Sequence, residues 1–477
     1  RVQDGGAAAR SAGGVADATP PPRARAAWGG PNRVPGSPRS RPTSRVARVG
    51  AHAELSRIRR TSPAARSAPV STTLEPGLVP PATVAPAPVA TARADVATST
   101  AYIATVLASA AGIVIGLLWD ISWHMTVGRD TFWSPPHLLE YASGIAAGLS
   151  SGYVVLRTTF AGSPGDRAAS VGFWGFRGPL GAWIAIWGTF AMLLSAPFDD
   201  WWHAAYGLDV KIVSPPHMVL LAGMLGILVG AICLTVSAQN RARDTGHRAR
   251  DAWMYAASGG ILCFILACAT IEYSWPNDQH ATRYYQVWGA VFPVVLVAYA
   301  SAGRLRWPAT AAALVYMGLW LAMGIVLRLV PAEPLLAPIY NPRTYMWPPY
   351  FPVWLVVPAL GVDLVLQRAR GRAAWRTALL LGVAFVALHV AVQWPWSSVM
   401  LTPAARVPVL NGGEWPYTTR PGPWMQEFWG PPEATGRIGA LEDGVALARG
   451  FAIAIGLAAL SSRLGLAWGR WMAQVRR

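Results

Sequence analysis

Long apolar runs constrain the fold of this sequence more than any other feature. A helix needs about 20 mostly apolar residues to cross a bilayer, and ten runs approach this length. The expected spans cover 101–119, 137–157, 179–198, 216–236, 252–272, 284–303, 308–330, 350–366, 374–394 and 446–469. Only 13% of the residues are charged, against about 25% in ordinary soluble domains. The sequence therefore predicts an all-α fold, a polytopic transmembrane helix bundle of about ten spans in the lipid bilayer.

The arginine distribution predicts how these spans are oriented. Lys and Arg close to span ends stay on the cytoplasmic side. Every even-numbered connection is basic, for example 157–177 and 368–376, and the chain ends on Arg476 and Arg477. Both termini are therefore expected in the cytoplasm. We expect a multi-pass protein of the cell inner (cytoplasmic) membrane, with the odd-numbered connections outside.

Composition divides the chain into three regions. Residues 1–94 are rich in Arg, Ala, Pro, Ser and Gly, so we expect a disordered head that cannot bury enough apolar surface to fold. Residues 95–250 are expected to form a four-span metal-binding region with an internal repeat. Residues 251–477 form a six-span region of unknown role with an outer loop at 395–445. The net charge of +17 lies in the head and in short loops without interleaved aromatics, which excludes a nucleic-acid partner.

Two outer segments repeat one pattern, Asp-x3-His followed by Gly, Asp and Ser-Pro-Pro-His. The candidate metal ligands are Asp120, His124 and His137 in the first copy and Asp199, His203 and His217 in the second. The two aspartates lie 79 positions apart with two expected spans between them, so both copies face the same side, as in a parallel repeat. Half of the chain's eight histidines fall in these segments.

The spacing suggests how each copy could hold a metal ion. Asp and His four residues apart share one face of a helix, and the Pro-Pro pair suits the first turn of the next span. The last histidine of each copy is therefore expected at the same outer end, and this set of nitrogen and oxygen donors suits copper, zinc or iron. A purely structural Asp–His pair with a histidine at the interface is the alternative. His280 and His389 lack such companions and are expected to be structural.

The segment from Asp120 to Tyr141 reads Asp-x2-Trp-His-x-Thr-x2-Arg-Asp-Thr and then Pro-x-His-Leu-Leu-Glu-Tyr. It resembles the C subunit of the copper membrane monooxygenases, the family of particulate methane and ammonia monooxygenases, over about residues 101–236. The resemblance implies copper on the first triad, Asp120 with the two histidines of its copy. It also implies a neighbouring metal site formed by the second copy, which shares His137. Asp199 stands where that family has Asn.

The resemblance implies a subunit of a copper-dependent membrane monooxygenase that hydroxylates a small substrate (methane, ammonia or short hydrocarbon class) with dioxygen. It also implies an oligomeric complex with other membrane subunits, A-like and B-like. Two alternatives remain: a membrane metal-binding or metal-transport protein without oxygenase activity, and a haem-bearing oxidoreductase. The groups expected to orient the imidazoles are Trp123, Asp130, Glu140, Tyr141 and Trp202. The aromatic, proline-rich connection at 331–350 is read as a cap over the metal region, a partner contact or an interfacial belt.

Overall fold

The structure is a computed structural model. It describes residues 99–128, 131–207, 214–242, 245–274, 276–333, 344–369, 371–405, 407–410 and 444–477. These residues all belong to one compact unit that extends over Pro86–Arg477. The expected disordered head up to residue 94, Asp130 and most of the expected outer loop 395–445 lie outside the described residues.

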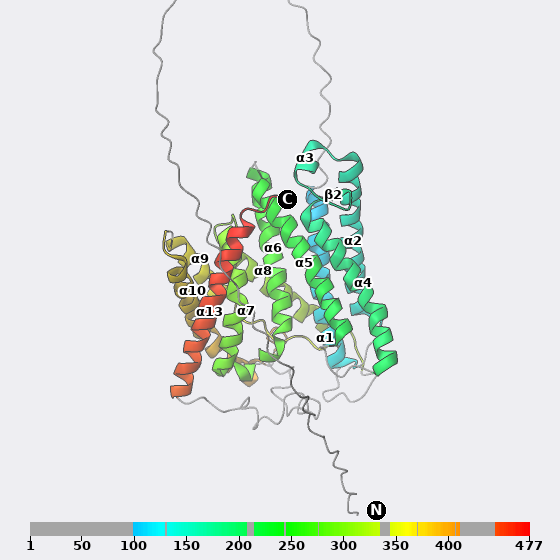
Figure 1. Cartoon of the computed structure of the whole chain (residues 1–477). Coiled ribbons are helices and arrows are strands. Elements are labelled where there is room, and N and C mark those ends of the chain that lie inside the picture. Colours follow the sequence, from blue (N-terminus) through cyan, green and yellow to red (C-terminus); the bar gives the residue numbers. More distant parts are fainter. Residues whose placement is uncertain are drawn as a thin grey trace, which may run out of the picture. The chain divides into compact units, whose positions relative to one another are not determined.

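A helix occupies each of the ten expected segments. These helices are α1 (Thr100–Thr126), α2 (Pro135–Ala161), α4 (Leu180–Tyr206), α5 (Pro215–Arg241), α6 (Thr245–Ala269), α7 (Thr282–Ala302), α8 (Pro308–Arg328), α9 (Val356–Arg368), α10 (Ala374–Met400) and α13 (Gly444–Met472). Figure 1 shows them side by side, with the short elements α3 and β2 at one end. The all-α bundle is therefore confirmed, apart from one small hairpin between α2 and α4.

Eight of the described helices, all of those above except α2 and α9, are long and apolar enough to cross a membrane. This matches a multi-pass membrane protein, while the count of ten spans and the orientation stay predictions. The segment 350–366, expected as one span, is helical only from Val356 onwards. Pro348, Pro349 and Pro352 precede this helix, and each proline lacks a backbone N–H and disfavours a helical conformation in the residue before it. The chain before α9 has no regular secondary structure and is mostly buried.

The repeat folds as two helix hairpins. Helix α1 packs on α2, α4 packs on α5, and the hairpins meet where α2 contacts α4 and α1 contacts α5. The seam between α4 and α5 is very close, because a Cβ added to Gly188 would lie 2.6 Å from the backbone nitrogen of Ile227. Such glycines let two helix backbones approach each other. The seam therefore holds α4 and α5 together as one unit.

A short connection joins the two hairpins. It contains α3 (Pro164–Ala168), which begins with a capping box between Ser163 and Asp166, and the strands β1 (Val171–Phe173) and β2 (Phe176–Gly178). The strands pair antiparallel around Trp174 and Gly175, which both have positive φ, as a two-residue turn in a tight hairpin requires. This hairpin lies at the end of α2 opposite His137.

Two of the remaining helices contact the repeat. Helix α6 packs on α1 and α5, and α8 packs on α1. Within this part, the buried carboxylate of Asp363 on α9 accepts hydrogen bonds from the backbone N–H groups of Ala309 and Thr310 and from the Thr310 hydroxyl. Asp363 therefore caps the start of α8, which begins at Pro308 and whose own cap position, Trp307, forms no side-chain cap.

Candidate metal centre

The first triad lies where α1 ends and α2 begins. Asp120 and His124 occupy the last two turns of α1, while Pro135 and Pro136 begin α2 and place His137 in its first turn. The Oδ1 atom of Asp120 lies 3.3 Å from His137 Nε2, and its Oδ2 atom lies 3.6 Å from His124 Nε2. One carboxylate therefore stands between two imidazoles, as the spacing predicted.

The second triad repeats this arrangement atom for atom at the junction of α4 and α5. The Oδ2 atom of Asp199 lies 3.3 Å from His203 Nε2, and its Oδ1 atom lies 3.8 Å from His217 Nε2. The N–H of His217 donates to Ser214 Oγ over 3.4 Å, so the serine of Ser-Pro-Pro-His caps α5. The six candidate ligands predicted from the sequence thus form two separate groups of three, one for each copy of the repeat.

The rings of His137 and His203 are fixed by backbone carbonyls. Nδ1 of His137 lies 2.9 Å from the carbonyl oxygen of Thr131, and Nδ1 of His203 lies 3.3 Å from that of Gly207. A carbonyl oxygen only accepts, so Nδ1 must carry the proton and donate. Nε2 is then the atom that faces the carboxylate in both copies.

With this tautomer, the contact between histidine Nε2 and the carboxylate oxygen is unfavourable unless a cation lies between them. A neutral imidazole with its proton on Nδ1 turns the lone pair of Nε2 towards an anionic oxygen, so two hydrogen-bond acceptors face each other. A second proton on the ring or a metal ion between the two atoms removes the conflict. In addition, Oδ1 of Asp120 and Oδ1 of Asp199 are buried and accept no hydrogen bond from the described residues. The same carboxylate atom is thus unsatisfied in both copies.

The donor set fits a transition-metal ion, but the triads are not closed around one. Ligand bonds of about 2.0–2.2 Å place neighbouring donors about 3.3 Å apart in a tetrahedral site, close to the shorter separations here. No three His, Cys, Asp or Glu side chains in the described part of the chain converge as a formed metal cage. A bound ion would therefore have to draw the two histidines of a triad together. His124, half exposed, is the ligand with the most room to move.

Glu140 and Tyr141, two of the groups expected to orient the imidazoles, pack against neighbouring helices. Glu140 is buried one turn beyond His137 and packs where α1 has Gly116, since a Cβ there would lie 2.5 Å from Glu140 Cγ. The Tyr141 hydroxyl lies 3.5 Å from Ser195 Oγ on α4, so it links the two hairpins. The sequence did not reveal the carbonyls that hold Nδ1, because any residue can supply a backbone oxygen.

The two predicted tryptophans lie beside the triads. Trp123 and Trp202 each directly precede the histidine of an Asp-x3-His pair. The ring of Trp202 lies 4.5 Å from that of Tyr206, and the buried Nε1 atom of Trp123 has no hydrogen-bond partner in the described ranges. These are packing contacts of the two indole rings. An orienting role for Trp123 and Trp202 stays a prediction.

A segment far along the chain holds the end of α1. The hydroxyl of Ser122 donates to the carbonyl oxygen of Trp347 over 2.6 Å, and the N–H of Trp347 donates to Thr126 Oγ1 over 2.7 Å. Ser122 and Thr126 belong to the same two turns of α1 as Asp120 and His124. The described part of the 331–350 connection therefore packs against α1 beside the first triad. Of the three interpretations of this connection, a position beside the candidate metal region is the one that this contact favours.

Replacing Thr126 by valine is expected to destabilise the protein by about 1–3 kcal/mol, because the buried N–H of Trp347 would lose its acceptor. Thr126→Ser keeps the hydroxyl and should unfold close to the wild-type midpoint. The measurement is denaturant or thermal unfolding of the purified chain in detergent. Equal destabilisation by both variants would show that the methyl group of Thr126, rather than its oxygen, holds this contact.

The two remaining predicted histidines have partners within the bundle. Nε2 of His280 lies 2.9 Å from Ser398 Oγ and 3.2 Å from the carbonyl oxygen of Trp394. His389 on α10 is fully buried, with Nε2 2.8 Å from the Tyr284 hydroxyl. Both contacts agree with the structural roles predicted for these residues. His280 is therefore a suitable control for substitutions in the triads.

No protein family, curated protein or solved structure significantly matches this chain.

Proposed function

We propose that this chain is a copper-binding subunit of a membrane monooxygenase, with the copper ion on Asp120, His124 and His137. The supporting observation is the buried, unsatisfied Oδ1 atom of Asp120, which faces the Nε2 atom of a histidine whose Nδ1 proton is already committed to the Thr131 carbonyl. A positive charge belongs between these atoms. The nitrogen and oxygen donors suit copper among the metals that such a set can hold.

The residues of the first triad would each have a defined task. Asp120 supplies the negative charge and spans the two imidazoles, and the Thr131 carbonyl keeps Nε2 of His137 directed towards it. The exposed side of His124 leaves the site open to a further ligand. The chemistry that copper supplies when bound is the activation of dioxygen for hydroxylation of a small substrate.

The assignment to a monooxygenase rests on the resemblance of the Asp120–Tyr141 segment to the C subunit of that family. It implies A-like and B-like partner subunits in an oligomeric complex of the inner membrane. The proposed role of the second triad, Asp199 with His203 and His217, is a neighbouring metal site. The aspartate adds a negative charge where the family has Asn, so this site would favour a metal ion of higher charge or different type.

A second candidate is a membrane metal-binding or metal-transport protein without oxygenase activity. It is favoured by the repetition of one geometry in both triads, as expected for two equivalent binding sites on one side of a membrane. The two candidates share the metal and differ in whether hydroxylation follows.

The test is metal analysis of the purified chain after equilibration with copper, for wild type, His137→Ala and the control His280→Ala. We expect the first variant to lose the copper of the first triad and the control to keep the wild-type amount. Unchanged copper in His137→Ala would contradict the site. Membranes that hold the copper-loaded chain and its partners should hydroxylate ammonia or a short hydrocarbon. Copper binding without any such oxidation would favour the second candidate.

A further inference from the structure

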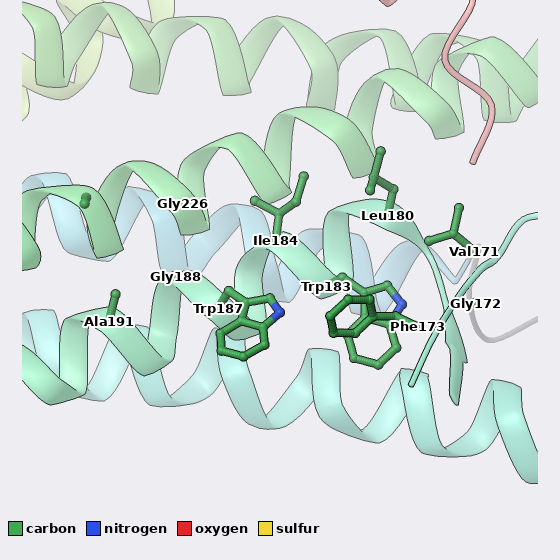
Figure 2. Close-up of a pocket in the computed structure, with 11 residues that line it drawn as sticks. Val171, Gly172, Phe173, Leu180, Trp183, Ile184, Trp187, Gly188, Ala191 and Gly226 are labelled. Carbon is green, nitrogen blue, oxygen red and sulfur yellow. The ribbon is translucent and has the colours of Figure 1, made fainter. Parts of the chain in front are cut away.

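An apolar groove of about 440 Å³ lies on the second hairpin, beside the β1–β2 turn and along the first half of α4. Figure 2 shows Trp183 and Trp187 of α4 together with Phe173 of β1 along it. The ring of Phe173 lies 5.3 Å from that of Trp183 and 6.4 Å from that of Trp187. Ala222 and Gly226 of α5 form part of the lining. No charged side chain lines the groove, so its occupant must be apolar where it is bound.

The groove opens on the outer face of the bundle. Trp187 is 47% exposed and Phe190 is 59% exposed on α4, a helix apolar enough to cross a membrane. At the tip of the hairpin Trp174 is 77% exposed, and its ring lies 6.0 Å from that of Trp187. Exposed aromatic side chains gather where a bilayer meets water. The face of the groove is therefore one that contacts lipid.

The connection beside the groove is positively charged. Arg167 and Arg177 lie in it and are exposed, and Arg157 lies in the last two turns of α2. Arg177 pairs with Gly172, a residue that lines the groove, and its Nε atom donates to Ser170 Oγ over 3.3 Å. The one acidic side chain among residues 156–178, Asp166, is buried in its own capping box. In addition, the buried Nε1 atom of Trp183 has no hydrogen-bond partner in the described part of the chain. The apolar groove thus adjoins a basic connection and an indole N–H without a partner.

We propose that this groove binds one anionic phospholipid of the bilayer, with an acyl chain along α4. Arg167 and Arg177 attract the phosphate, and the indole N–H of Trp183 donates to an oxygen of the lipid. A basic cluster at a membrane surface recognises anionic headgroups in this way. The lining on α4 runs from Leu180 to Ala191, about 16 Å, a length that one acyl chain can follow.

The basic end of this site is far from the metal centre. Leu180 and Asp199 are 19 residues apart on one helix, about 28 Å along its axis. The other end is closer, since Ala191 lies eight residues before Asp199 on α4 and Ala222 lies five residues after His217 on α5. The arginine substitutions, which precede α4, can therefore be tested independently of the triads.

The experiment is native mass spectrometry of the full chain with added phosphatidylglycerol or phosphatidylcholine of identical acyl chains. Wild type should retain one phosphatidylglycerol molecule in preference to phosphatidylcholine. Arg167→Gln with Arg177→Gln should weaken phosphatidylglycerol binding by about 30-fold and remove the preference. The matched control is Arg372→Gln with Arg376→Gln, which removes two exposed arginines from another connection and should change nothing.

A second variant tests the apolar part. Ala222 lines the groove and is exposed, so Ala222→Phe should fill it without disturbing the core, and binding of both lipids should fall at least about 10-fold. Ala146→Phe places the same ring on an exposed position of α2 and should retain the lipid. Equal binding of both lipids by wild type would overturn the proposal. So would unchanged retention in Ala222→Phe, or a second protein chain held at the groove in place of lipid.

Discussion

Asp120→Ala is expected to remove one copper ion per chain, and Asp120→Ala combined with Asp199→Ala to remove all copper bound by the triads. In each copy the two carboxylate oxygens face two imidazoles, so the aspartate supplies the negative charge that lets both histidines face one cation. Loss of outer partners of metal ligands costs about 10–100-fold in affinity, so loss of the carboxylate itself should cost at least about 100-fold. Competition with a copper chelator measures this affinity.

Asp200→Ala is the matched control for these substitutions. Asp200 adjoins Asp199 on α4 and is exposed, so its removal changes the charge equally without touching a triad. Copper binding should stay at the wild-type level. If Asp120→Ala alone removed all copper, the second triad would bind no copper of its own, as a site that favours another metal ion would. If the double substitution left copper binding unchanged, neither triad would be a metal site.

Gly188→Leu is expected to have the largest effect on the fold. A Cβ at this position would lie 2.6 Å from the backbone nitrogen of Ile227 and 2.8 Å from the carbonyl oxygen of Gly223. These are backbone atoms, so relief requires α4 and α5 to move apart. Overpacking of this kind costs about 1–3 kcal/mol or more. Because α4 carries Asp199 and α5 carries His217, the variant should also lose the metal of the second triad.

The control for this variant is Gly152→Leu. Gly152 lies in α2, and a Cβ added there meets no atom within 4 Å, so the new side chain enters open space. Its unfolding midpoint should stay close to that of wild type, and the first triad should keep its copper in both variants. A stable Gly188→Leu protein with full metal content would show that the seam between α4 and α5 yields more easily than its backbone contacts indicate.

The helices and the proximity of the candidate ligands within each copy could be predicted from sequence because both depend on local patterns. Apolar runs gave the place of each helix, and the Asp-x3-His and Pro-Pro-His spacings placed each group of three at a helix junction. The segment 350–355 was expected to begin a helical span, but the helix begins only at Val356. Hydropathy counts the aromatic and aliphatic residues of this segment and takes no account of Pro352, which disfavours a helical conformation in the residue before it.

The sequence could not predict contacts made by backbone groups, because such contacts do not depend on the residue type. The carbonyl of Thr131 fixes the ring of His137, but every residue has a carbonyl. The bond between Ser122 and Trp347 joins positions 225 residues apart, and no local period encodes such a pairing. Whether a proton or a metal ion lies between the carboxylate and the imidazoles likewise depends on the separations of their atoms. The sequence indicates only which residues come near each other.

The contact of Trp347 with α1 has a consequence for any attempt to obtain a minimal metal-binding fragment. Cutting the chain after α5 would keep all six candidate ligands but would leave Ser122 and Thr126, both buried in the intact protein, without the backbone that they bind. We expect the last turns of α1 to lose order in such a fragment, and Asp120 and His124 to move away from His137. The segment that carries Trp347 thus supports the first triad from outside the repeat, so a fragment that ends after α5 is expected to bind metal more weakly than the full chain.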